Sequence, residues 1–333
     1  MNREKMNKME RLISNFNKAK IGVIGDIVAD FYVYGKPFKL SREAPVLVIR
    51  HDGEKIIPGS AGNTINNLAC LEANVYPVGI IGNDKEGEAV INCFAGKKVV
   101  LSGIVKDRSW VTISKTRIMA GDDNTSKQQV IRIDREPMKK ITTKMEKRII
   151  SNLKDIAGEI DALIVADYSY NLITPVILKE ILAIARKKIV VVDSHHQLKD
   201  FKGVHIVTPN QGEAEEATGI TIKNDRDLEQ AGEKLLKGLK SKAVLITRGN
   251  AGMALFEVGK NMNKIPIFGR DDITDVTGAG DTVTSVLTLA LVAGASLIKA
   301  AYLANYGASV VVMKRGTATL TGEELLKRIK KDE

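Results

Sequence analysis

The sequence contains few cysteines, few aromatic residues and no long apolar run. Its two cysteines, Cys70 and Cys93, show neither CxxC spacing nor neighbouring histidines, which argues against a disulfide framework and a zinc site. Free thiols suit the reducing cytoplasm, where we expect the protein to reside. No segment approaches the ~18 apolar residues of a membrane span, and the charged N-terminus lacks the apolar core of a secretion signal. We therefore expect neither membrane insertion nor secretion.

Aromatic residues make up only 5% of the chain, whereas hydrophobic residues make up 44%, so the core must be mostly aliphatic. Valine and isoleucine gather in short runs, which is typical of buried parallel strands. A length of 333 residues accommodates one large α/β domain with an accessory element. Because no linker or internal repeat divides the chain, we predict a single domain over residues 1–333.

The formal net charge is +10, with lysine and arginine spread along the chain and densest over residues 1–20 and 327–331. No DNA- or RNA-binding motif accompanies this charge, so a solvated basic surface explains it more simply than nucleic-acid binding. We expect no nucleic-acid partner. A basic surface also attracts phosphorylated small molecules.

Strands and helices alternate along the second half of the chain. The expected strands are 162–166, 189–192, 205–207 and 243–247, and the expected helices are 144–157, 175–186, 211–218, 225–239, 281–293 and 297–311. With earlier strands at 21–25 and 75–82, this order predicts a central, mostly parallel sheet flanked by helices.

A separate small sheet is expected in the first half of the chain. Residues 32–50 carry β-branched and aromatic side chains interrupted by Pro37 and Pro45, and proline confines a strand to an edge or to a small sheet. Residues 109–134 also have strand character, around the polar loop Gly121–Lys127. We predict that 32–50 and 109–134 form a small β lid, whose edge strand favours dimerisation.

The most informative segment is the run DVTGAGDT at residues 275–282. Gly278, Ala279 and Gly280 allow backbone N–H groups to converge, and an apolar helix starting near Asp281 adds its positive dipole end. Such an arrangement binds and stabilises a phosphoryl group. The carboxylate of Asp281 can accept the proton of an attacking hydroxyl. An ordinary helix N-cap aspartate is equally compatible with this segment alone.

Three further segments accompany this run: Gly59–Asn63 (GSAGN), Thr208–Glu213 (TPNQGE) and Thr247–Gly252 (TRGNAG). Neither GxxxxGK[ST] nor GxGxxGxV occurs, which disfavours a P-loop ATPase and a protein kinase. In this order the segments resemble the signatures of the ribokinase, or PfkB, family of carbohydrate kinases, over about residues 21–326. The resemblance implies a ribokinase-like fold and an ATP-dependent sugar kinase. Ser60 stands where the family has glycine.

The resemblance implies roles at the sugar site. Asp30 matches an aspartate that binds sugar hydroxyls, because a carboxylate accepts several hydrogen bonds. Asn63 and Asn67 lie one helical turn apart, so both could face the sugar, but Asn63 is the better candidate and Asn67 could instead cap or pack. Lys115 and Arg117 alternate on a strand and point to one face, which would suit a sugar phosphate or solvent equally. The expected substrate-binding residues are Asp30, Gly59, Asn63, Asn67, Lys115 and Arg117.

The resemblance also implies a nucleotide site. Asn210 and Glu213 would organise Mg²⁺ through water, and oxygen ligands with retained waters fit this ion. Glu213 also suits the first turn of a helix without any metal. Asp275 and Thr277 could hold a monovalent cation. The expected ATP-binding residues are Asn210, Glu213, Thr247, Arg248, Gly249, Gly252 and Asn305, with the amides of Gly278, Ala279 and Gly280 at the transferred phosphoryl group.

Within the family, the chain resembles kinases of D-glycero-β-D-manno-heptose 7-phosphate, which occur as one domain of a bifunctional protein. The likeness is carried by residues 25–35, 41–46, 115–117, 128–136, 303–305 and 314–318. It implies transfer to the anomeric hydroxyl, giving the 1,7-bisphosphate precursor of ADP-heptose and lipopolysaccharide core, and a homodimer clasped through the lids. No HxGH element of a nucleotidyltransferase is present, so we expect a stand-alone kinase.

Two turns depart from the heptose-kinase pattern: residues 167–171 (DYSYN) and residues 192–196 (VDSHH). His195 and His196 are adjacent in an extended segment and point apart, so they make a poor metal-binding pair, and we expect an exposed polar turn. Because such departures concern substrate-facing loops, another carbohydrate or nucleoside kinase of the same family, such as a ribokinase-like or hexose-phosphate kinase, stays an alternative. A non-catalytic sugar or nucleotide sensor is the alternative outside enzymes.

Overall fold

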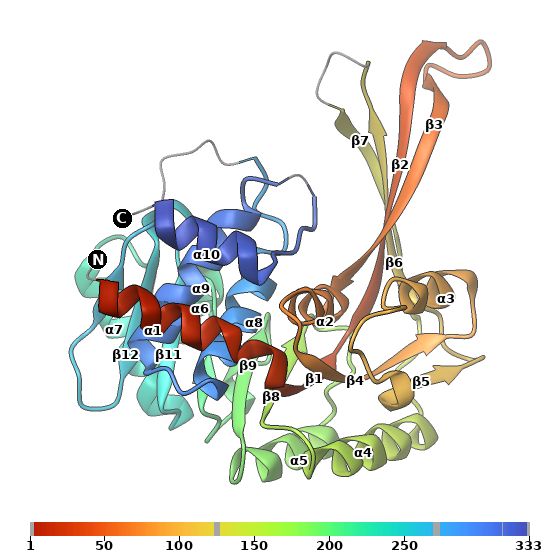
Figure 1. The fold of residues 1–333 in the computed structure, drawn as a ribbon. Helices are drawn as coiled ribbons and strands as arrows, with labels where there is room; N and C mark the ends of the chain where they lie inside the picture. Colours follow the sequence, from red (N-terminus) through yellow and green to blue (C-terminus); the bar gives the residue numbers. More distant parts are fainter. Residues whose placement is uncertain (1–2, 123–126, 269–273, 315, 332–333) are drawn as a thin grey trace.

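Figure 1 shows a body of helices around a central sheet, from which a second sheet of long strands extends. The computed structural model describes residues 3–122, 127–268, 274–314 and 316–331. Over these residues the central sheet has nine strands and the second sheet has four. The predicted class, a mostly parallel sheet flanked by helices with a small second sheet, is confirmed.

The central sheet has the strand order β13-β12-β11-β10-β9-β8-β1-β4-β5. Its strands are β1 (Lys20–Gly25), β4 (Asn74–Gly82), β5 (Ile104–Asp107), β8 (Ala162–Asp167), β9 (Ile189–Ser194), β10 (Ile206–Val207), β11 (Ala243–Thr247), β12 (Met253–Glu257) and β13 (Asn263–Ile265). Among the described residues of this central sheet, only the β11–β12 and β12–β13 pairs are antiparallel. From β1 the chain moves to β4 and β5 on one side and then to β8 on the other. Ligands bind at the carboxyl ends of strands beside such a reversal.

Helices cover both faces of this sheet because its strands are apolar on both sides. In β8, Ile164 and Ala166 point into one core and Leu163 and Val165 into the other. The first core is covered by α1 (Arg3–Ser14), α2 (Ala61–Cys70), α8 (Ala279–Val292), α9 (Leu297–Val311) and α10 (Gly322–Lys331). The second is covered by α4 (Thr143–Ala157), α5 (Pro175–Ala185), α6 (Gln211–Thr218) and α7 (Asp225–Leu239). No described helix is long and apolar enough to cross a membrane.

The second sheet begins one residue after Asp26 and has the order β3-β2-β6-β7. Its strands are β2 (Ile27–Leu40), β3 (Leu47–Ser60), β6 (Ile113–Ala120) and β7 (Gln128–Arg135), with α3 (Lys85–Asn92) packed against β2 and β3. Beyond Gly35, β2 has no β6 partner, so Pro37 occupies an edge position that proline tolerates. The segments predicted as a lid fall in this sheet, and their closing role stays a prediction. Residues 123–126 of the expected loop lie outside the described residues.

Several observed elements were not predicted, namely α3, β5, β12, β13 and α10. The clearest example is α10, whose charged residues favoured the interpretation of a solvated basic tail. Leu325 and Ile329 lie one turn apart in this helix and are fully buried. These two buried residues suffice to hold α10 on the core because the helix packs against α1 and α9. The sequence alone does not reveal these packing partners.

Ser60 joins β3 to α2 with an unusual backbone conformation, φ 53° and ψ −129°. This region favours glycine, because a Cβ there approaches the backbone closely. The hydroxyl of Ser60 caps no helix N–H group that would offset the strain. The turn therefore keeps a glycine-type geometry at the position where the sequence departs from the family's glycine.

We expect Ser60→Gly to raise the free energy of unfolding by up to about 1 kcal/mol. It relieves a strain of roughly 1–3 kcal/mol and loses part of that gain to the flexibility of glycine in the unfolded chain. Denaturant unfolding monitored by circular dichroism measures the change. Ser60→Ala keeps the Cβ and is the matched control. Equal stabilities of the glycine and alanine variants would contradict a strained turn.

Candidate active site

A cavity of about 630 Å³ lies at the carboxyl ends of β8 to β11. Tyr168, Asp193 and Thr247 line it from the strand side. Asp281 lines it from the first turn of α8, and Asn305 lines it from α9. The predicted base and several predicted nucleotide-site residues therefore share one cavity.

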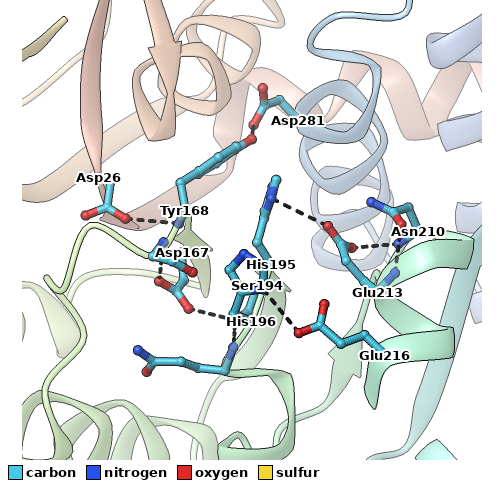
Figure 2. Close-up of polar contacts among 12 residues, drawn as sticks. Asp26, Asp167, Tyr168, Ser194, His195, His196, Asn210, Glu213, Glu216 and Asp281 are labelled. Carbon is cyan, nitrogen blue, oxygen red and sulfur yellow. Dashed lines mark hydrogen bonds and ion pairs between the residues drawn. The ribbon is translucent and has the colours of Figure 1, made fainter. Parts of the chain in front are cut away.

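Asp281 is 4% exposed, and three side chains donate hydrogen bonds to it. Asn63 Nδ2 donates to Oδ2 at 2.8 Å, and Thr64 Oγ1 donates to Oδ1 at 2.9 Å. The hydroxyl of Tyr168 donates to Oδ1 at 2.7 Å (Figure 2). Burial raises the pKa of Asp281, the hydrogen bonds oppose that rise, and the charge of Asp30 adds to it. The result is a fixed carboxylate that is more basic than one in water.

Asp30 lies in β2, on the side of the second sheet that meets the body. Arg117 Nη1 donates to Asp30 Oδ1 at 2.6 Å, and Thr317 Oγ1 donates to Oδ2 at 3.4 Å. Gly59 makes room for this carboxylate, because a Cβ at that position would lie 2.3 Å from Oδ2. The structure thus brings together three predicted sugar-site residues and adds Thr317 to them.

Lys115 shares this face of the second sheet with Arg117. Its Nζ lies 5.7 Å from the centroid of the Tyr170 ring, and the Arg117 guanidinium lies 5.2 Å from the centroid of the Tyr32 ring. Both cations are therefore supported by aromatic faces. Lys115 and Arg117 do not line the cavity that contains Asp281.

Asn63 and Asn67 are fully buried in α2. Asn67 Nδ2 donates to the carbonyl oxygen of Asn63 at 3.0 Å, and Thr282 Oγ1 donates to Asn67 Oδ1 at 3.0 Å. These bonds tie α2 to α8 and orient the Asn63 amide toward Asp281. Asn63 therefore supports the candidate base directly, and Asn67 has the packing role that the sequence left open as an alternative to facing the sugar.

Two acidic residues, Asp193 at the end of β9 and Glu213 in the first turn of α6, form an acidic wall of the cavity. Asn210 and Glu213 form a reciprocal cap on α6, with Asn210 N 2.8 Å from Glu213 Oε2 and Glu213 N 2.9 Å from Asn210 Oδ1. Burial, followed by the charges of Glu213 and Asp281, raises the pKa of Asp193 well above its usual range. Burial also raises the pKa of Glu213. Among the described residues, no cluster of three or more His, Cys, Asp or Glu could by itself hold a metal ion.

His195 is half-buried and lines the cavity, so the expectation of an exposed polar turn is wrong for this residue. Its ring lies on Tyr168 with centroids 4.5 Å apart, and its Nδ1 is 3.7 Å from Glu213 Oε1 (Figure 2). His196 is exposed and its Nδ1 lies 3.3 Å from Glu216 Oε1. The two side chains have different partners, and His196 is the more exposed of the two.

The turn after β11 forms the rim of the cavity. Thr247, Gly249 and Gly252 line it, and a Cβ on Gly252 would lie 2.1 Å from the Ile265 carbonyl oxygen. Arg248 is not part of the lining, because its Nε donates to Gln211 Oε1 at 3.2 Å. The structure therefore brings the backbone of this predicted loop to the cavity and leaves the arginine side chain beside it.

The far end of the cavity is largely apolar. Asn305 Nδ2 donates to the Pro266 carbonyl oxygen at 2.6 Å, which ties α9 to the segment after β13. Phe268 lines the cavity and stacks on Tyr306 at 3.9 Å between ring centroids. A flat aromatic wall beside an amide is suited to a nucleobase.

The glycine turn before α8 has the left-handed residue expected of it. Gly278 has φ 79°, and a Cβ there would lie 2.5 Å from Asn63 Nδ2. The amide of Ala279 donates to the Val276 carbonyl oxygen at 3.2 Å, so in this structure it is engaged within the turn. The oxygens of Asp275 accept from the amides of Thr277 and Gly316, at 2.9 and 3.0 Å. Gly280 completes the lining beside Asp281.

Sequence reasoning missed Tyr168, Thr64, Asp193 and His195 as residues of this site. Tyr168 and His195 lie in the two turns that were noted only as departures from a pattern. The available signal was their position, because both turns follow buried parallel strands whose carboxyl ends meet at one edge.

The comparisons with known proteins match this geometry. The model of the pfkB family of carbohydrate kinases matches residues 18–323. The chain belongs to this family. The predicted family and enzyme class, an ATP-dependent carbohydrate kinase, are confirmed.

Curated relatives of this PfkB-family chain are named bifunctional protein HldE. The chain is 39% identical to that of Geobacter sulfurreducens over 96% of its own length and 64% of the relative. It is 36% identical to that of Geotalea uraniireducens, over 97% of its own length and 65% of the relative. The chain thus spans somewhat less than two thirds of these relatives.

Solved structures with the same fold include a ribokinase from Arabidopsis thaliana, complexed with ribose and ATP. It has a TM-score of 0.72 at 21% identity, covering 94% of this chain and 99% of that chain. Phosphofructokinase-2 from Escherichia coli has a TM-score of 0.77 at 16% identity, with the same coverage. At these identities the likeness concerns the fold, and it confirms the predicted ribokinase-like class.

We expect Gly59→Ala to raise the KM for the sugar about tenfold or more and to leave the KM for ATP unchanged. The added methyl group would displace the Asp30 carboxylate, and hydrogen bonds to a charged group are worth roughly 1.5–3 kcal/mol. Steady-state kinetics with each substrate varied in turn measure both constants. Gly158→Ala, where an added Cβ meets nothing within 4 Å, is the control. A normal sugar KM in Gly59→Ala would argue against Asp30 as a sugar ligand.

Proposed function

We propose that this chain transfers the γ-phosphoryl group of ATP to the anomeric hydroxyl of D-glycero-β-D-manno-heptose 7-phosphate, giving the 1,7-bisphosphate. The observation that carries the proposal is the buried carboxylate of Asp281 at the N-terminus of α8, facing a cavity that extends to Asn305. A raised pKa suits a general base, because its basicity exceeds that of an ordinary carboxylate.

The reaction is a direct in-line displacement. The sugar hydroxyl gives its proton to Asp281 while its oxygen bonds to the γ-phosphorus, and the bond from that phosphorus to the bridging oxygen of ADP breaks. The turn at Gly278 and Gly280, with the positive end of α8, stabilises the charge on the equatorial oxygens. Closure of the second sheet as a lid excludes water that would otherwise take the phosphoryl group.

Mg²⁺ fits the acidic wall. Asp193 and Glu213 are oxygen donors whose pKa values are raised by burial, so a nearby cation would stabilise both in the ionised form. Asn210 and Glu213 would hold the ion through water, and Asp193 faces the same space. When bound, Mg²⁺ neutralises part of the charge of the ATP phosphates. Asp275 and Thr277 are the residues proposed to bind a monovalent cation.

The sugar phosphate is proposed for the space between the body and the second sheet. Asp30 offers a carboxylate to sugar hydroxyls, and Lys115 and Arg117 supply positive charge on the same face. The similarity to the HldE proteins supports heptose 7-phosphate over ribose or a hexose phosphate. We place the reaction in the cytoplasm, which supplies ATP and suits the free thiols of Cys70 and Cys93.

The test is a panel of acceptors with mass-spectrometric identification of the product. We expect ATP consumption with heptose 7-phosphate, a bisphosphate product, and little turnover with heptose, ribose or fructose 6-phosphate. A preference for an unphosphorylated sugar would reject the heptose-phosphate assignment. Salt-sensitive DNA binding without any sugar-dependent turnover would favour the non-catalytic reading.

We expect Asp281→Asn to bind ATP normally and to lose turnover by about 10²–10⁴-fold, the usual contribution of a general base. Equilibrium nucleotide binding and single-turnover kinetics separate the two effects. Near-normal turnover of this variant would reject Asp281 as the base.

We further propose a homodimer formed through the second sheet. The strand register puts Phe31, Val33, Ile118, Ile131 and Ile133 on the face opposite Asp30 and Lys115. Ile131 is 54% exposed and Ile133 is 56% exposed. An apolar face on an extended sheet is suited to a second copy of the same sheet.

We expect Ile131→Asp to shift the protein from dimer to monomer, because it places a charge in the proposed contact. Analytical ultracentrifugation measures the mass in solution. Met138→Asp is the control, since Met138 is 99% exposed and lies beyond β7. A dimer that persists in Ile131→Asp, or that is lost equally in both variants, would exclude this face.

A further inference from the structure

The turn after β8 carries a tyrosine whose hydroxyl reaches the candidate base. Tyr168 OH is 2.7 Å from Asp281 Oδ1, and Thr64 Oγ1 donates to the same oxygen at 2.9 Å (Figure 2 shows the tyrosine bond). Asn63 Nδ2 donates to the other oxygen, Oδ2, at 2.8 Å. The two oxygens of this carboxylate are therefore not equivalent.

A carboxylate has about four acceptor positions, two on each oxygen. Tyr168 and Thr64 take both positions on Oδ1, whereas Asn63 takes one position on Oδ2. Among the residues that the structure describes, no other side chain donates to Oδ2, so one acceptor position remains on that oxygen. Oδ2 of Asp281 therefore keeps one lone pair that can accept the proton of a substrate hydroxyl.

The buried carboxyl group of Asp26 holds the turn that carries Tyr168 in place. Asp26 Oδ2 accepts from the amide of Tyr168 at 2.9 Å and from the amide of Tyr170 at 3.3 Å. Ser169 and Asn171 have φ 67° and 65°, which non-glycine residues rarely adopt without such anchoring. The Tyr168 ring also packs on His195. The hydroxyl is thus aimed by the fold rather than left to rotate freely.

We propose that Tyr168 is a positioning residue for the base: its hydroxyl holds Oδ1 of Asp281, so that Oδ2 takes the substrate proton, and Asp26 fixes the turn that presents this hydroxyl. The inference rests on the proposed role of Asp281 as the base.

The charges around Asp281 set the direction of a pH test. Asp30 of β2 and Asp193 of β9 are the carboxyl groups that interact with it, and the charge of Asp30 adds to the rise in its pKa that burial causes, while its hydrogen-bond donors lie on α2 and in the turn after β8. Burial, followed by the charges of Asp281 and Asp193, raises the pKa of Tyr168 well above its usual value, so it stays a neutral donor. Its hydrogen bond lowers the pKa of Asp281. Removing that donor must raise the pKa of the base.

The experiment is Tyr168→Phe, which keeps the ring against His195 and removes only the hydroxyl. We expect kcat to fall about tenfold, as for the loss of one hydrogen bond, with an unchanged KM for ATP. The acid limb of the kcat–pH profile should move to higher pH. Tyr76→Phe, which removes a hydroxyl from β4 away from the cavity, is the matched control.

A direct titration makes the outcome independent of turnover. The ¹³C resonance of the Asp281 carboxyl group, assigned by its loss in Asp281→Asn, should titrate at higher pH in Tyr168→Phe than in the wild type or in Tyr76→Phe. Asp26→Ala, which frees the turn, should shift it in the same direction. An unchanged titration of Asp281 in both Tyr168→Phe and Asp26→Ala would overturn the inference. A lower melting temperature of Tyr168→Phe with an unshifted acid limb of its kcat–pH profile would also overturn it. Absence of turnover in the wild type with every sugar would instead reject the proposed function.

Discussion

The arrangement of the site depends on one buried carboxylate and the hydrogen bonds that hold it. Asp281 is stabilised by donors from two parts of the chain that are far apart in sequence, α2 and the turn after β8. Without these donors, burial would favour the protonated acid, which cannot accept a proton. The same bonds fasten the start of α8 to the sheet. One set of contacts therefore fixes both the chemistry of the group and the position of the helix that carries it.

The topology explains how the proposed sugar and nucleotide sites can meet at this carboxylate. The strand order reverses between β1 and β8, and the turns that follow these strands meet at the reversal. The second sheet begins directly after β1, so Asp30 lies a few residues from the central sheet. The proposed nucleotide site uses the ends of β9, β10 and β11, which line the cavity. A substrate on the second sheet and ATP along the cavity would thus approach Asp281 from different sides.

Much of the fold could be predicted because buried parallel strands and amphipathic helices leave periodic patterns. The strands β1, β4, β8 and β11 and the helices α4 to α9 were predicted to within about two residues at most boundaries. The antiparallel strands β12 and β13 and the helix α10 were missed. They are short or highly charged, and packing against neighbours that no local pattern reveals stabilises them.

The sequence by itself determined the family and the position of the candidate base, because a glycine turn before a helix is a local feature. Only the tertiary structure decided what surrounds that base. It directed Asn63 toward Asp281, paired Arg117 with Asp30, and brought Tyr168 and His195 to the cavity. The three hydrogen bonds among these contacts join residues 87 or more positions apart in the sequence. Hydrogen-bond partners at such separations depend on strand order and helix packing, which are properties of the whole chain rather than of any motif.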